Sequence, residues 1–162
     1  MTGWRLGYLA AESEIASAVD KLQGQETSAP SSISQKAGLA AYSHSLDEVH
    51  AMRDVFEKRR DMVMRRIQAM DGVKCFVPDG AFYVFPDIST WLPATLTNGK
   101  RIEDATDFCM LALEVSGLGM VPGDAFGQPG CIRLSFAASD EDLKEGLDRL
   151  ETALNELRQA HT

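Results

Sequence analysis

Two arginines stand in settings suited to binding an anion. Arg5 lies between Gly3 and Gly7, and these glycines leave little side-chain bulk beside the guanidinium, which suits the close approach of an anion. Arg133 lies at the centre of the alternating segment 131–137, a pattern typical of a strand. Desolvating an arginine on a strand is costly unless an anion meets it, so a carboxylate or a phosphate is the natural ligand. For both arginines an internal Asp or Glu is the alternative partner.

The sequence contains no metal-binding or nucleotide-binding pattern. The histidines have no companions at ligand spacing, and neither a GxSxG motif nor a phosphate-binding or dinucleotide glycine motif occurs. The cysteines are odd in number, widely spaced and partly within apolar segments, which predicts reduced core thiols and no disulfide or zinc site. These residues are His44, His50, His161, Cys75, Cys109 and Cys131.

Composition and charge exclude several classes of protein. The chain has 162 residues, 44% hydrophobic and 25% charged, which is ordinary for one globular domain. Sixteen Lys and Arg against 24 Asp and Glu give a net charge of −8, so we expect binding neither to nucleic acid nor to an anionic membrane surface. No apolar segment approaches the roughly 20 residues of a membrane-spanning helix, and the first residues lack the order of a signal peptide. We therefore expect a cytoplasmic protein.

The first 70 residues are predicted to hold a strand and three helices. Alternating apolar residues predict a half-buried strand over Trp4–Leu9, and helices are expected over Ser13–Gln23 and Ile33–Tyr42. Ser45 stands three residues before a glutamate, which is capping-box spacing. A long helix over Leu46–Met70, with one apolar face and mixed charges, is expected to follow.

The remaining residues mix strands and helices without strict alternation. An antiparallel hairpin is expected over 73–85, with its turn at 78–80, followed by an irregular loop over 88–101. A helix over Glu103–Val115 is predicted to bury Phe108, Leu111, Ala112 and Val115. A strand over 131–137 and a last helix capped by Ser139, with a core-facing leucine stripe, complete the pattern. This order predicts an α+β fold, a short antiparallel sheet packed by helices.

Five short segments resemble, in collinear order, the signatures of the class I aminotransferases. These are pyridoxal-phosphate enzymes with the fold of aspartate aminotransferase, an α/β family. The resemblance implies that residues 1–44 are the trailing part of the large cofactor-binding domain, 45–70 the connecting helix and 71–162 the small C-terminal domain. The segments are Thr2–Tyr8, Thr27–Ser31, Gly80–Tyr83, Val121–Gly127 and Ile132–Phe136.

The resemblance also implies roles for individual residues. Arg5 matches the arginine that holds the phosphate of pyridoxal 5'-phosphate, and Ser28 matches a loop near the cofactor phosphate of the neighbouring subunit. Many relatives have asparagine where this chain has Ala29. Arg133 matches the arginine that grips the α-carboxylate of the substrate. Phe82 matches an aromatic that lines the substrate cleft, although a core position in the hairpin explains it equally well.

The resemblance places the lysine that holds the cofactor a few residues upstream of Met1. None of the chain's own lysines stands in that motif context, so we expect no catalytic residue here, no bound cofactor and no transamination by this polypeptide alone. The implied parent is a homodimer that transfers an amino group from an amino acid, aspartate or a broad range, to a 2-oxo acid. A lyase or synthase of the same fold and a non-catalytic interaction module remain as alternatives.

Overall fold

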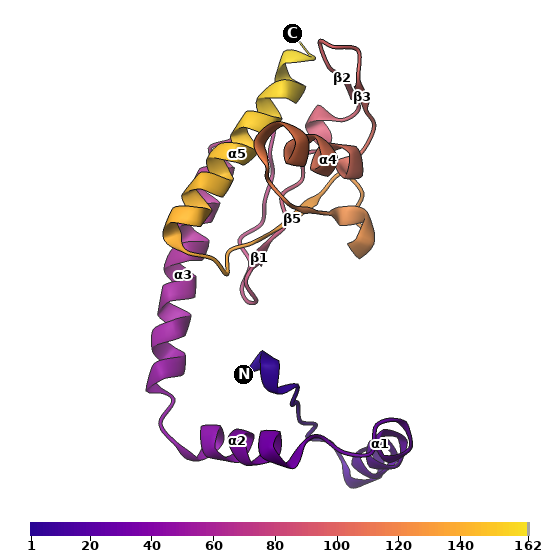
Figure 1. The fold of residues 1–162 in the computed structure, drawn as a ribbon, viewed down its shortest axis with the longest axis vertical. Helices are drawn as coiled ribbons and strands as arrows, with labels where there is room; N and C mark the ends of the chain where they lie inside the picture. Colours follow the sequence, from indigo (N-terminus) through magenta and orange to yellow (C-terminus); the bar gives the residue numbers. More distant parts are fainter. Residues whose placement is uncertain (162) are drawn as a thin grey trace. The chain divides into compact units, whose positions relative to one another are not determined.

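The structure, a computed structural model, describes residues 1–161. The chain divides into two compact units, Met1–Ala51 and Met52–Thr162. Figure 1 labels the helices and strands along the chain. The division falls inside helix α3 (Asp47–Gln68), so this helix contributes residues to both units. The division into residues 1–44, 45–70 and 71–162 stays a prediction.

The unit of residues 1–51 consists of short helical elements. The two predicted helices are confirmed as α1 (Ser13–Glu26) and α2 (Ser32–Ser43), and a single 3-10 turn, η1 (Thr2–Trp4), precedes them. Gly38 of α2 is buried, and a Cβ there would lie 2.5 Å from Leu6 Cδ2. The glycine therefore lets the chain near Leu6 pack directly against α2.

The predicted strand over Trp4–Leu9 is wrong. The chain forms η1 and then continues without regular structure, and Arg5 adopts a left-handed backbone with φ of 51°. Alternation favours an extended chain, but a strand exists only when a second strand satisfies its backbone hydrogen bonds. No segment within residues 1–161 pairs with it, which explains why the pattern did not produce a strand.

Two helices of the unit from Met52 onward have side-chain caps, of which the sequence predicts the one at Ser139. The carboxylate of Asp104 accepts hydrogen bonds from two N–H groups in the first turn of α4 (Ala105–Ser116), and Gly117 ends that helix with φ of 68°. The hydroxyl of Ser139 accepts one from the first turn of α5 (Asp140–Gln159). These contacts satisfy N–H groups that have no partner inside the helix.

The buried core of this unit lies between α3, α4, α5 and a small sheet. The leucine stripe of the last helix is confirmed, because all of its members are buried. They are Leu143, Leu147, Leu150, Leu154 and Leu157. In α4, Phe108, Leu111 and Ala112 are buried as predicted, but Val115 is 44% exposed. The helical period puts Val115 near the apolar face, yet it carries no information on where along the helix the core ends.

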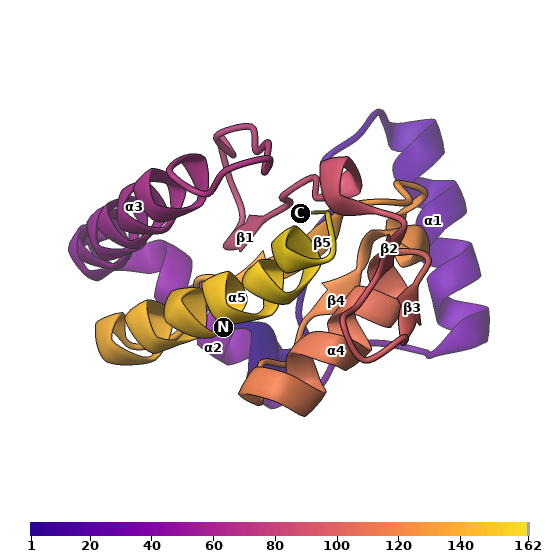
Figure 2. The same cartoon turned by 90° about the horizontal axis from the view of Figure 1, so that it is seen from above.

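Three short strands form an antiparallel sheet with the order β1-β5-β4. They are β1 (Tyr83–Val84), β4 (Val121–Pro122) and β5 (Ile132–Ser135), and Figure 2 shows them with α4 and α5. This sheet and the helices around it confirm the α+β class expected for this part of the chain.

Two predictions for residues 73–101 need correction. The predicted hairpin exists only as one bridge, between Lys74 and Asp87, because β1 pairs with β5 and not with residues 73–77. The predicted loop over 88–101 contains a second hairpin, β2 (Ala94–Thr95) with β3 (Arg101–Ile102), after the 3-10 turn η2 (Ser89–Trp91). Its turn holds Asn98-Gly99, with Gly99 at φ of 84°, a sequence typical of tight hairpins.

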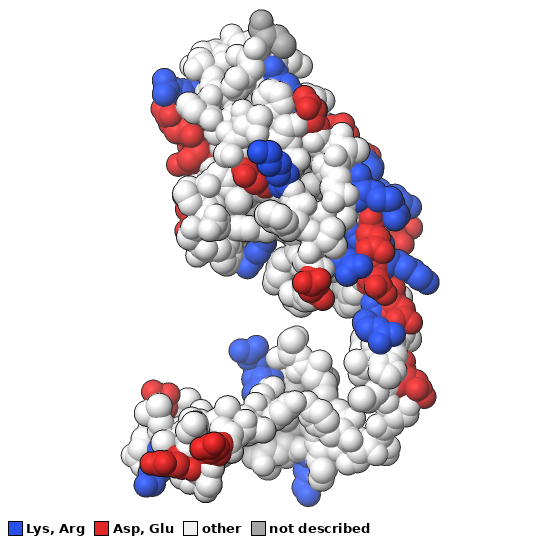
Figure 3. All heavy atoms as spheres, turned by 180° about the vertical axis from the view of Figure 1, so that it is seen from behind, with Lys and Arg blue, Asp and Glu red and all other residues white. Residues whose placement is uncertain are grey.

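Charged side chains of both signs alternate along α3, as Figure 3 shows in blue and red. Arg53 pairs with Asp54, and Arg60 pairs with Asp61 and Glu57. The basic residues of this helix therefore lie beside acidic ones and form no continuous positive surface, as their interspersion in the sequence indicates.

All three cysteines are free thiols. Cys109 is buried, as the predicted core position requires, whereas Cys75 and Cys131 are only half-buried. Among residues 1–161, no group of His, Cys, Asp and Glu is arranged to hold a metal ion. Over the same residues, no helix is both long enough and apolar enough to cross a membrane.

The buried thiol of Cys109 predicts a loss of stability at alkaline pH. Burial, with smaller effects from Asp104 and Asp124, raises the pKa of this thiol from 9.0 to about 11. Between these values the unfolded chain has released a proton that the folded chain keeps, so the free energy of unfolding falls as the pH rises. We expect a steeper fall in the wild type than in Cys109→Ala, measured by urea unfolding at about pH 8 and about pH 10.5. Equal falls would contradict this account.

Candidate functional site

Strand register places Arg133 on the open face of the sheet. Tyr83 stands opposite Ser135, and Arg133 stands two residues before Ser135 on the same strand. Opposed residues and residues two apart share a face, so these three side chains lie on one side of the sheet. Ile132 and Val84, on the other side, are fully or almost fully buried. One face of the sheet therefore closes the core, and the other presents the arginine.

Two aromatic rings hold the guanidinium of Arg133. Its Cζ lies 4.5 Å from the centroid of the Tyr83 ring and 4.3 Å from that of Phe126. Within the described residues these two rings make no contact with each other, so each makes its own contact with the guanidinium. Such cation–π contacts use the face of the cation and leave its N–H groups available.

Arg133 has no acidic partner within residues 1–161. Ion pairs involve other arginines of the chain, and no side-chain hydrogen bond within that range reaches this guanidinium. The alternative of an internal Asp or Glu is therefore not realised for Arg133. A half-buried cation with free N–H groups is suited to a planar carboxylate, which it can bind through two parallel hydrogen bonds.

A tight turn carries Phe126 to the arginine. Phe126 ends η3 (Gly123–Phe126), where the N–H of Gly123 donates to the carbonyl oxygen of Cys131 at 2.7 Å. A Cβ on Gly123 would lie 2.3 Å from the carbonyl oxygen of Gln128, so only glycine fits this turn. The ring of Phe126 also meets the edge of Phe85, with centroids 6.0 Å apart. These contacts fix the position of Phe126 over Arg133.

Phe82 joins the arginine site to a neighbouring hollow. Its ring lies 4.5 Å from that of Tyr83 and 6.3 Å from that of Phe56, and it is 38% exposed. It also lines an open hollow of about 590 Å³ beside Arg53 and Arg60. Phe82 thus packs against aromatic neighbours but is exposed, so the alternative of a core position in the hairpin is wrong. The substrate-cleft role stays a prediction.

Arg5 and Ser28 belong to the other unit, where the structure brings them into no contact with each other. Both are exposed and both have left-handed backbones, with φ of 51° and 67°. Arg5 donates to the carbonyl oxygen of Thr2 at 3.4 Å, and no acidic side chain within residues 1–161 pairs with it. A guanidinium and a hydroxyl are donors that suit a phosphate dianion, so the donor chemistry fits the phosphate of the implied cofactor.

Sequence reasoning missed Tyr83 and Phe126 as partners of Arg133. Both stood inside segments already singled out, at 80–83 and 121–127. An arginine on a strand, with no acidic residue nearby in sequence and aromatics in the neighbouring segments, is the signal that could have found them. The strand pairing that brings them together was not available from the pattern.

Comparison with known proteins identifies the family. Residues 1–150 match the family described as "Aminotransferase class I and II". The chain belongs to this family, the fold type I aminotransferases that depend on pyridoxal 5'-phosphate.

Its similar relatives are named aspartate aminotransferases. The chain is 44% identical to one from Pinus pinaster over 99% of this chain and 33% of the relative. It is 43% identical to one from Rhizobium meliloti strain 1021 over 97% of this chain and 38% of the relative. The crystal structure of the aspartate aminotransferase from Rhizobium meliloti superposes with a TM-score of 0.88 at 42% identity, over 96% of this chain and 39% of the other. The chain therefore spans only about a third to two-fifths of the length of the relatives it matches.

Proposed function

We propose that this chain supplies the carboxylate-binding part of a cytoplasmic, homodimeric aminotransferase that uses pyridoxal 5'-phosphate. In this proposal, Arg133 binds the α-carboxylate of the amino-acid donor and then that of the 2-oxo acid. The observation that carries the proposal is the guanidinium of Arg133, which contacts the rings of Tyr83 and Phe126 and has no acidic partner in the described chain. A fixed planar fork would orient the substrate by its carboxylate, so that the same bond at the α-carbon faces the reacting groups each time.

Arg5 and Ser28 are the residues proposed to hold the cofactor. Arg5 would bind the phosphate, and Ser28 would add a hydroxyl to the phosphate of the neighbouring subunit. When bound, the cofactor supplies an electron sink for reactions at the substrate's α-carbon. Both residues are exposed, and within residues 1–161 Arg5 makes no ion pair, which supports this assignment.

Aspartate, or a broad range of amino acids, is the proposed donor. The names of the relatives, aspartate aminotransferases, support this choice. Phe82 would line the substrate cleft, and its partial exposure beside the hollow supports that role. A lyase or synthase of the same fold would use the same carboxylate site. An interaction module, in contrast, has no need of two separated arginines without acidic partners.

The proposal also holds that residues 1–162 do not transaminate on their own, because none of their lysines stands in the expected motif. The test supplies pyridoxal 5'-phosphate, aspartate and 2-oxoglutarate to this chain and to a longer polypeptide that spans the family's length and contains it. We expect oxaloacetate only from the longer polypeptide. Turnover by the short chain would contradict the second part of the proposal. Release of ammonia without amino transfer would favour the lyase alternative, and turnover of other donors but not aspartate would refute the proposed donor.

A further inference from the structure

We propose that Tyr83 and Phe126 are positioning residues, an aromatic clamp that holds Arg133 ready to bind a carboxylate. This inference rests on the proposed function and assigns a role to two residues that bind no substrate atom themselves. It starts from the two ring contacts to one guanidinium, 4.5 Å and 4.3 Å from Cζ to the ring centroids.

The clamp explains why the site uses aromatic rings and no acidic side chain to hold the arginine. A carboxylate partner would occupy the N–H groups and would compete with the substrate for them. A ring attracts the cation through its π face and leaves the in-plane N–H groups unpaired. Arg133 is thus restrained without losing the donors that a substrate carboxylate needs.

Restraint of the arginine before binding is expected to strengthen binding. A free arginine side chain has many rotamers, and binding would have to fix one of them at a cost in entropy. In the folded chain, the contacts with Tyr83 and Phe126 already restrict the rotamers of Arg133. Less side-chain entropy is therefore lost when a carboxylate binds. The effect of each ring should therefore appear as a change in carboxylate affinity, even though neither ring contacts the carboxylate.

Each ring is held by its own local structure. Tyr83 is fixed by the pairing of β1 with β5, opposite Ser135, and by its contact with Phe82. Phe126 is fixed by the turn at Gly123 and by the edge of Phe85. Phe126 is 47% exposed at the surface, so replacing it removes little of the buried core. It is the better position for a test.

The test titrates the 162-residue chain with succinate and measures binding by isothermal titration calorimetry in every variant. In the variants that keep Arg133, nuclear magnetic resonance also follows the Nε–H signal of this arginine. The variants are Phe126→Leu, Phe126→Tyr and Arg133→Gln. Phe76→Leu is the matched control, because Phe76 lies in the same unit, is 97% exposed and makes no ring contact within residues 1–161. Thermal unfolding checks that every variant folds.

Phe126→Leu should weaken succinate binding about three- to tenfold and move the Arg133 signal, because the leucine has no π face or ring current. Phe126→Tyr should bind within about twofold of the wild type, since it restores the ring, and Phe76→Leu should bind as the wild type does. Arg133→Gln should abolish binding.

A failure of the clamp proposal and a failure of the carboxylate-site proposal would give different results in this titration. If Phe126→Leu binds succinate as the wild type does and leaves the Arg133 signal in place, the clamp is refuted while the carboxylate site stands. If Phe126→Tyr is as weak as Phe126→Leu, the ring's π face is not what matters, and the clamp is again refuted. If the wild type and Arg133→Gln respond to succinate alike, the proposed carboxylate site is refuted, and the clamp that depends on it falls with it.

Discussion

In the longer polypeptide that spans the family's length and contains this chain, replacing Arg133 with lysine is expected to lower kcat/KM about 100-fold without preventing folding. Lysine keeps the positive charge but presents no planar pair of N–H donors to the carboxylate. It also gives up the contacts of the guanidinium with the rings of Tyr83 and Phe126. The loss of one charge-assisted hydrogen bond and of the side chain's restraint accounts for about 3 kcal/mol. Steady-state kinetics with aspartate and 2-oxoglutarate would measure it.

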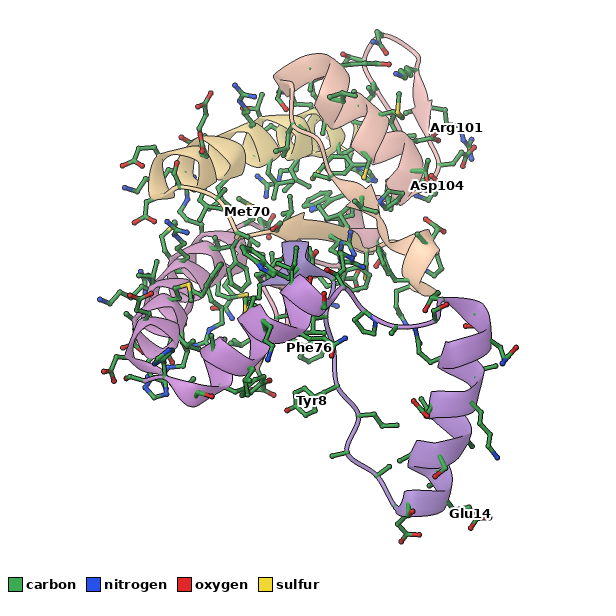
Figure 4. The ribbon with its side chains drawn as sticks, turned by 60° about the horizontal axis from the view of Figure 1, so that its bottom comes forward. Tyr8, Glu14, Met70, Phe76, Arg101 and Asp104 are labelled. Carbon is green, nitrogen blue, oxygen red and sulfur yellow. The ribbon has the colours of Figure 1, made fainter. Side chains whose placement is uncertain are left out.

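Arg101→Lys is the matched control for this substitution. Arg101 lies on β3, pairs with nearby Glu103 and is exposed, as Figure 4 shows for its labelled side chain. The same change there should leave kcat/KM within about twofold, because exposed ion pairs contribute little. If Arg133→Lys lowered kcat/KM no more than Arg101→Lys does, a positive charge alone would suffice to bind the carboxylate. The argument from the two parallel N–H donors of the guanidinium would then be wrong.

Helices and their ends were predictable from the sequence because their signals are local. Ser139 caps the last helix as its residue type and position predict. The helix expected over Glu103–Val115 is observed within two residues of that start and one of that end, as Ala105–Ser116. The leucine stripe of α5 faces the core because its spacing follows the helical period. None of these features depends on a distant segment.

Strands were predicted less well because a strand depends on its partner. Trp4–Leu9 alternates but finds no partner within residues 1–161, and Tyr83 pairs with β5 and not with the segment just before it. The prediction of the candidate site was limited in the same way, by its dependence on distant segments. Arg133 was found by its type and setting, but its partners Tyr83 and Phe126 become visible only through the pairing of β1 with β5 and the turn at Gly123.

Gly72 lies where the backbone turns under the indole of Trp91. Its φ is +72°, and a Cβ there would lie 2.3 Å from Trp91 Nε1. The indole has no freedom to move aside, because its N–H donates to the carbonyl oxygen of Asp71 at 3.0 Å and Arg158 lies over its ring. Arg158 donates to the same carbonyl oxygen at 2.9 Å. Any side chain at position 72 would therefore disturb this whole cluster.

Gly72→Ala is accordingly expected to lower the free energy of unfolding by about 3 kcal/mol, from left-handed strain and from the clash together. Gly99→Ala should cost only about 1 kcal/mol, because φ there is +84° but no atom lies within 4 Å of the added Cβ. Comparing the two variants by urea unfolding separates the cost of left-handed strain from the cost of the clash with Trp91. In a Trp91→Leu background the cost of Gly72→Ala should fall to about that of Gly99→Ala, because the clashing indole is gone. An unchanged cost in that background would show that the backbone alone, and not the packing of Trp91, requires glycine at position 72.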